Sequence, residues 1–316
     1  MSKHKDQHFI PRSYLKAWCD PTTPKGQTPY IWLFGKDGKD ARKKSPDKIF
    51  FEKEMYTITK ADGERDLVLE HGLGQLESEF VNIRRKKLNN LKKLDIYEHV
   101  IVCVFIAAMQ GRTKAQRDHF QEQWKEPLEM MESMMEWAKT ATPEEKIQAS
   151  SLSSVSSKEK GLSYENVKAL YEKPMQNMLP SLINIASPLL CKLDFAVLYT
   201  DSEIGFITSD NPCVWFDPEA YKRPPLYRSP ALRYKTTEIR LPISPTQCIV
   251  LNQHGIKGYI KVRPNDVDEM NRIIRFSAEK HFVVNKNFKR DTWFDPGIEP
   301  EDSWENTQKK KESKEV

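Results

Sequence analysis

The sequence Asp95-Ile96-Tyr97-Glu98 is followed, after one histidine, by the run Val100-Ile101-Val102-Cys103-Val104-Phe105-Ile106, and this stretch decides the fold. Asp95 with an acidic residue three positions later is a capping box, the signature of a helix start. The run behind it is apolar on every side, which is typical of a helix that is buried all round. The sequence therefore predicts a helix here, at the centre of the core.

Helical patterns continue on both sides of this run. Upstream, apolar residues recur at helical spacing over residues 66–94. Downstream, Thr142-Pro143-Glu144-Glu145 combines a capping residue, a proline at the first position and acidic residues in the first turn. A further helix is expected over residues 163–185, interrupted near Pro174 and Pro180. Residues 61–190 are thus predicted to be a helical segment.

Two features inside this segment carry an interpretation of their own. The methionines Met130, Met131, Met134 and Met135 fall four apart in two rows, which favours adaptable core packing over a groove for a partner. Residues 149–160 are dense in serine, which predicts a loop or a frayed helix end.

Strand patterns lie at the two ends of the chain. Short β-rich runs are expected over residues 30–34, 49–51 and 55–58, and again over residues 195–199, 205–208, 237–241, 248–251 and 281–284. A helix over residues 265–279 precedes the last of them. Residues 217–230 hold four prolines and predict a long surface loop.

These patterns predict an α+β fold, with the helical middle segment packed on a mixed or antiparallel sheet built from N-terminal and C-terminal strands. We expect one domain over residues 1–300, divided into the N-terminal strands (1–60), the helical segment (61–190) and a β-rich segment with a late helix (191–300). Residues 301–316 form a charged tail that is expected to be disordered.

The composition indicates a cellular compartment and limits the classes of partner molecule that we expect. The 316 residues carry a formal net charge of +5, too small to indicate nucleic-acid binding without a focused basic patch. Five cysteines stand far apart with no Cys-x-x-Cys pair, so neither a disulfide framework nor a zinc knuckle fits, and reduced thiols suit the cytoplasm. The start lacks a signal peptide, and the longest apolar stretch, residues 100–109, is half the length of a membrane span. We expect a soluble, cytoplasmic protein with no membrane partner.

Two short segments are the first candidates for a site. His8, beside Phe9-Ile10-Pro11, is suited to act as a general base or a metal ligand, or it anchors the N-terminus by a hydrogen bond to a backbone carbonyl. Ser209-Asp210-Asn211-Pro212 directly follows a strand, where small polar side chains often reach into a site; the same residues also make ordinary turns.

A sharper hypothesis joins Asp210 to Glu238-Ile239-Arg240. An acidic residue followed by a strand with Glu-x-basic is the outline of metal-dependent nucleases, in which two carboxylates hold a divalent metal such as Mg²⁺. Asp210 and Glu238 are then the metal ligands, His8 joins them as a catalytic residue, and Asn211 and Arg240 contact substrate. Arginine stands where lysine is usual, and its charge cannot be given up. Arg112 either clamps a phosphate or forms an ion pair with a nearby glutamate.

Four segments together resemble a known family. They are Gln7-His8-Phe9-Ile10-Pro11 continuing to Trp18, Phe206-Ile207-Thr208-Ser209-Asp210-Asn211-Pro212, Leu241-Pro242-Ile243-Ser244-Pro245, and Asn271-Arg272-Ile273-Ile274 continuing to Ala278. In this order they are similar to the signatures of the bacterial and fungal domain-of-unknown-function family DUF 4238. The resemblance implies that His8, Asp210 and Asn211 are signature positions, without assigning them roles.

Two function classes remain open at this stage. The first is a metal-dependent hydrolase acting on nucleic acid; the second is a non-catalytic ligand-binding or sensing module. The hydrolase requires His8, Asp210 and Arg112 around an open cavity. The binding module instead requires these residues to be buried and satisfied, with an apolar or basic patch elsewhere. In either case, we expect the first two signature segments to meet near the sheet.

Overall fold

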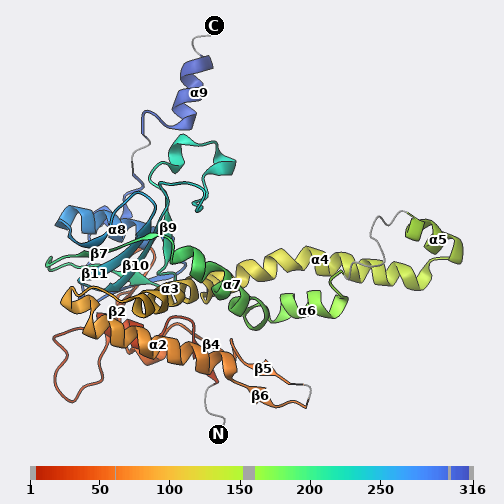
Figure 1. Cartoon of the computed structure of the whole chain (residues 1–316), viewed down its shortest axis with the longest axis horizontal. Helices are drawn as coiled ribbons and strands as arrows, with labels where there is room; N and C mark the ends of the chain where they lie inside the picture. Colours follow the sequence, from red (N-terminus) through yellow and green to blue (C-terminus); the bar gives the residue numbers. More distant parts are fainter. Residues whose placement is uncertain (1–4, 61, 152–160, 298–299, 313–316) are drawn as a thin grey trace.

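A computed structural model of the chain describes residues 5–60, 62–151, 161–297 and 300–312. Two sheets and several helices form a body, and three helices extend from it as an arm (Figure 1). The expected α+β class is confirmed: helices and mostly antiparallel strands share one structure. No helix in the described ranges is both long and apolar enough to cross a bilayer.

The larger sheet has five strands from the second half of the chain. Its order is β12 (Gly258–Lys261), β7 (Asp194–Tyr199), β11 (Gln247–Asn252), β10 (Glu238–Ser244) and β9 (Val214–Phe216). All neighbours are antiparallel except β12 and β7. Every residue of β11 is buried, as expected for a central strand covered on both faces.

The second sheet joins the two ends of the chain. Its order is β3 (Arg42–Lys44), β2 (Ile31–Gly35), β13 (His281–Val284) and β8 (Thr208–Ser209), all antiparallel. Val283 lies opposite Leu33 and both are buried. Two small ribbons complete the strands, β1 (Asp6–His8) with β4 (Phe51–Lys53) and β5 (Ile58–Thr59) with β6 (Arg65–Asp66). The sheet predicted from N-terminal and C-terminal strands is therefore present.

Helices α2 (Val68–Lys86), α3 (Ile96–Gly111) and α7 (Pro174–Leu190) pack together beside the larger sheet, and all three contribute buried side chains to the main apolar core. The capping box at Asp95 is confirmed, and the second half of α3 is buried almost without a break. The Phe105 ring stacks on Phe80 of α2 with centroids 3.7 Å apart. A Cβ at Gly111 would lie 2.8 Å from Leu179 and Leu182, so glycine lets α3 and α7 approach closely.

The arm consists of α4 (Lys114–Thr140), α5 (Pro143–Ser151) and α6 (Tyr164–Glu172), and α5 lies at its tip (Figure 1). The methionine prediction is wrong here: Met130 is 64% exposed and Met134 60% exposed. Among the described residues, α6 packs along α4 and α7 contacts its first half, and neither covers the surface that carries Met130 and Met134. The arm contacts α7 through Trp124, whose Nε1 lies 3.3 Å from the sulfur of Met178.

Helix boundaries differ from the sequence predictions in three places. Pro174 begins α7, but Pro180 lies inside this helix and does not interrupt it. The helix expected to reach residue 94 ends at Lys86, and a short 3-10 turn with a left-handed Leu91 (φ 53°) follows. The charged tail contains α9 (Trp304–Glu312), after α8 (Pro264–Ser277) and β13. Most of the serine-dense stretch, residues 152–160, lies outside the described residues.

Candidate functional site

The four signature segments meet through buried side chains. The Tyr14 hydroxyl, in α1 (Arg12–Leu15), donates to the carbonyl oxygen of Pro242 at 2.6 Å and lies 2.7 Å from the Thr208 hydroxyl. Trp18 donates its indole N–H to the carbonyl oxygen of Phe206 at 2.8 Å. Both aromatic side chains are fully buried. The first signature is therefore bonded to the second and the third, so the expected meeting is observed, through Tyr14 and Trp18.

The fourth signature is tied in by one amide. The side chain of Asn271, on α8, accepts from the backbone N–H of Ile207 and donates to the carbonyl oxygen of Gly205, both at 2.9 Å. Gly205 has φ +65°, and a Cβ there would lie 2.4 Å from the carbonyl oxygen of Pro245. Because Asn271 is completely buried and fully bonded, it fixes α8 against the β8 region.

The carboxylate of Asp210 is hydrogen-bonded to backbone N–H groups. Its carboxylate oxygens accept from the N–H groups of Glu279, Lys280 and His281 at 2.8–2.9 Å. Its neighbour Asn211 donates to the carbonyl oxygen of Ser277 at 3.1 Å. The pair thus closes the turn between α8 and β13, some 70 residues further along the chain. The turn interpretation expects these side chains to bond nearby backbone amides; the local contact is instead made by Ser209, whose hydroxyl accepts from the N–H of Asn211 at 3.1 Å.

Glu238 and Arg240 pair with each other at the start of β10. The guanidinium of Arg240 lies 2.6 Å from a Glu238 oxygen and 4.3 Å from the ring centre of Phe216. His254 contacts the other Glu238 oxygen at 3.1 Å. Across the described residues, no hydrogen bond or ion pair links Asp210 to Glu238, so the two carboxylates have separate partners.

Arg112, the C-cap of α3, is almost completely buried. It donates to a Glu77 carboxylate oxygen at 2.7 Å and to the carbonyl oxygen of His8 at 2.6 Å. Tyr56 donates its hydroxyl to the carbonyl oxygen of Arg112 at 3.2 Å. Of the two interpretations, the ion pair with a glutamate is the one observed. Arg112 joins α2, α3 and β1, and its donors are directed at these elements.

His8 lies beside this ion pair. Its Nε2 is buried and has no hydrogen-bond partner among the described residues, and its ring centre lies 5.5 Å from that of Phe51. Burial, together with the nearby Arg12 guanidinium, lowers the pKa of His8 to about 4. The imidazole is therefore neutral near pH 7, where such a low pKa makes it a weak general base.

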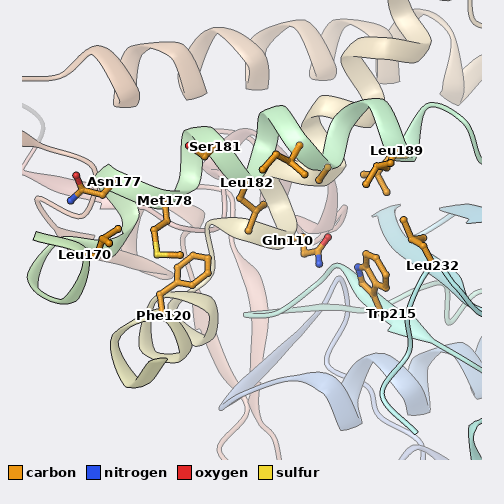
Figure 2. Close-up of a pocket in the computed structure, with 13 residues that line it drawn as sticks. Gln110, Phe120, Leu170, Asn177, Met178, Ser181, Leu182, Leu189, Trp215 and Leu232 are labelled. Carbon is orange, nitrogen blue, oxygen red and sulfur yellow. The ribbon is translucent and has the colours of Figure 1, made fainter. Parts of the chain in front are cut away.

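An open apolar pocket lies elsewhere, between α7, the arm and the edge of the larger sheet. Its volume is about 560 Å³. Figure 2 shows Leu182 and Leu189 of α7, Phe120 of α4 and Trp215 of β9 around it, with Gln110 and Trp215 toward the end opposite Asn177. None of the residues that line it is acidic, basic or a histidine.

Two features of the pocket indicate a site. The indole Nε1 of Trp215 is buried and has no hydrogen-bond partner among the described residues, which ordinarily costs about 1–3 kcal/mol. On α7, Ile185 is 67% exposed and Leu189 43% exposed. Sequence reasoning missed this pocket. The available signal was the width of the apolar surface of α7, since Met175 and Leu179 face the core while Leu182 and Ile185 face the pocket.

Residues 6–288 match a family model, whose description is "Protein of unknown function (DUF4238)". The match includes all four signature segments. No curated protein and no solved structure matches the chain.

Proposed function

We propose that this chain, which belongs to the family of proteins of unknown function DUF4238, is a ligand-binding module. Its ligand is a small, largely apolar organic molecule with a hydrogen-bond acceptor, held in the pocket between α7 and β9. The indole N–H of Trp215, which has no hydrogen-bond partner among the described residues, carries this proposal: the side chain lines the pocket, and a small rotation of the ring would turn its buried N–H toward a ligand there. Buried polar groups almost always have a partner, and at Trp215 a ligand in the adjoining pocket would supply it.

The size and lining of the pocket support a small molecule. Ligand pockets typically measure about 300–1,000 Å³ and are mostly apolar with a few polar groups that fix orientation. The cavity of about 560 Å³ lies in this range, and the Gln110 amide and the Trp215 indole supply the orienting groups. Covering Ile185 and Leu189 would remove exposed apolar surface from water, a gain of about 25 cal/mol per Å².

The lining favours binding over catalysis. Indole, amide and hydroxyl groups donate and accept hydrogen bonds, but they do not exchange protons readily near pH 7. With no acidic, basic or histidine side chain in the lining, the pocket has no general acid or base and no counter-charge for a phosphate.

The metal-dependent nuclease stays a prediction with a direct test. Asp210 accepts from backbone N–H groups and Glu238 pairs with Arg240, and no contact joins the two carboxylates among the described residues, so the geometry favours it less. We expect calorimetry to give the same small heat of Mg²⁺ addition for the wild type and for Asp210→Ala. Specific binding by the wild type that Asp210→Ala removes would restore the nuclease hypothesis.

A matched pair of ligands tests the binding proposal. 2-Acetonaphthalene carries a carbonyl acceptor, and 2-ethylnaphthalene has nearly the same shape without one. We expect both to quench tryptophan fluorescence, with the ketone binding more tightly. In Trp215→Phe the ketone should lose about five- to tenfold in affinity, the value of one hydrogen bond, while the hydrocarbon should change little.

Two further variants complete this experiment. Trp137→Phe replaces an exposed tryptophan on the arm and should leave both affinities unchanged. Ala186→Trp fills the pocket and should abolish binding of both ligands, with circular dichroism to check the fold. If neither ligand binds the wild type, or if Ala186→Trp binds both as before, the proposal is wrong.

A further inference from the structure

Three side chains of the types that bind zinc lie close together where α3 meets the C-terminal end of α7. His99 and Cys103 are four residues apart on this helix and therefore share a face. Cys191, the C-cap of α7, approaches from the other side. The Sγ of Cys103 lies 3.7 Å from Nε2 of His99, and the three donor atoms lie within 4.8 Å of one another. Across the described ranges, this is the one such group of histidine, cysteine and carboxylate donors.

We propose that His99, Cys103 and Cys191 bind one Zn²⁺ ion. In tetrahedral zinc sites, bond lengths of about 2.0–2.1 Å to nitrogen and 2.3 Å to sulfur place neighbouring donors about 3.6–3.8 Å apart. The separation of Cys103 and His99 already has this value. Small side-chain rotations bring Cys191 to the same distance, because the group spans no more than 4.8 Å.

The chemistry of the three side chains selects the metal. Two thiolates and an imidazole are soft or borderline ligands, which suit Zn²⁺ and not Mg²⁺ or Ca²⁺. Two thiolates also neutralise the dication, so the site carries no net charge, which suits a partly buried position.

The surroundings leave room for a fourth ligand. His99 also lines a cavity of about 670 Å³ together with Leu193, Phe195 and Tyr259. The Phe195 ring meets the imidazole edge to face at 5.3 Å, which holds its plane. With three protein ligands and a cavity beside one of them, the site resembles zinc centres that keep one open position for water or an exogenous ligand. This cavity has lining residues distinct from those of the Trp215 pocket, so the zinc proposal is independent of the proposed function.

Cobalt substitution tests the site directly, because Co²⁺ bound to thiolate absorbs strongly in the near ultraviolet whereas Zn²⁺ is silent. We expect the reduced full-length chain to bind one Co²⁺ with this absorption, and Zn²⁺ to displace it stoichiometrically. Competition with a chromophoric chelator then gives the Zn²⁺ affinity. Removal of one ligand should weaken it by roughly 100-fold or more, since even outer-shell partners of a metal site are worth 10–100-fold.

The variants are chosen to keep the fold intact. Cys191→Ser and His99→Asn alter partly exposed ligands and should lose the near-ultraviolet band, with circular dichroism as a check. Cys19→Ser alters another partly exposed cysteine, near α1, and should keep both the band and the affinity. Wild-type protein without the band, or Cys191→Ser with the full band, would overturn the proposal.

A disulfide bond between Cys103 and Cys191 is the alternative explanation for the short distance between these two thiols. It predicts that the chain, unfolded without reductant, shows three titratable thiols in place of the five cysteines present, and that peptide mapping recovers the two linked segments. Such a result with no metal bound would also overturn the zinc site. Five free thiols together with one bound metal would support it.

Discussion

Helices α3 and α4 are neighbours in the chain and have opposite surroundings. The second half of α3 lies in the core, whereas Phe120 and Leu128 are the buried residues among the 27 of α4. An apolar run has to be buried, so α3 could be placed from sequence. Methionines at helical spacing carry no such requirement, because their exposure depends on whether another element covers them. The burial of α3 in the body thus follows from the hydrophobicity of its own sequence. The exposure of side chains on the arm depends on which other elements pack against it.

The two regions also differ in how their buried residues connect. Phe105 belongs to one contiguous cluster that includes residues of α1, α2, α7 and the larger sheet. Phe120, Leu128 and Val167 of the arm are buried but lie outside that cluster. Loss of a core side chain should therefore destabilise the body as a whole, while loss of an arm contact should act locally.

The largest expected effect is that of Phe105→Ala in the body. The change removes the ring that stacks on Phe80 and leaves a cavity, so we expect the free energy of unfolding to fall by about 3–5 kcal/mol. Urea denaturation followed by circular dichroism measures it. Met134→Ala on the arm is the matched control and should change it by less than about 0.5 kcal/mol. Equal losses would contradict the distinction between the two regions.

Asp210→Ala comes next, because it removes the acceptor of three backbone N–H groups in the body. An unsatisfied buried donor costs about 1–3 kcal/mol, and partial access of water to the turn limits the sum to about 3 kcal/mol. The same denaturation experiment applies. Asp201→Ala is the control, since Asp201 makes an exposed ion pair with Lys261 whose loss should leave the stability nearly unchanged.

A capping residue on the arm should have a smaller and local effect. Ser163 caps α6 by accepting from the backbone N–H of Asn166 at 3.2 Å. We expect Ser163→Ala to cost about 1 kcal/mol. Hydrogen exchange should show faster exchange in α6 and the adjoining part of α4, with unchanged protection in α3. Faster exchange in α3 would show that arm and body unfold together.

The smallest effect concerns pH. Because the pKa of His8 is lowered to about 4 in the folded chain, the unfolded chain binds a proton more readily between pH 6.5 and 4. The stability associated with neutral His8 is thus fully present above pH 6.5 and is lost as pH falls toward 4. We expect a loss below about 1 kcal/mol, since water screens a partly exposed imidazole. His8→Gln should reduce the slope of folding stability against pH between pH 6.5 and 4. An unchanged slope would show that other groups cause this pH dependence.

The elements that were predicted correctly are those whose signals are local. The capping box at Asp95, the strand His281–Val284 and the start of a helix at Thr142 each follow from neighbouring residues. Strand order could not be predicted, because the pairing of β2 with β13 joins residues some 250 positions apart. Pro180 was misjudged for a similar reason, since the helix around it is supported by packing against α3.

The same limit applies to the sites. The sequence identified Asp210 and Arg112 as unusual, but whether an oxygen or a guanidinium is free depends on partners far along the chain, such as Lys280 or Glu77. The spacing of His99 and Cys103 was visible in the sequence, yet Cys191 comes close only in the folded chain. Trp215 becomes notable only in the folded structure, where its N–H has no partner in the part of the chain that is described.

The position of β13 between β2 and β8 has a consequence for biosynthesis. A ribosome makes β2 some 250 residues before β13, so during that interval β2 can pair with β3 but not with β13. Tyr14 and Trp18 likewise cannot form their side-chain hydrogen bonds until the acceptor residues beyond position 200 have been synthesised. Apolar side chains of these N-terminal segments therefore lack their native partners until residues 206–284 have been synthesised. A premature stop codon before residue 281 should yield an aggregation-prone product that depends on chaperones and is degraded, and not a smaller folded protein.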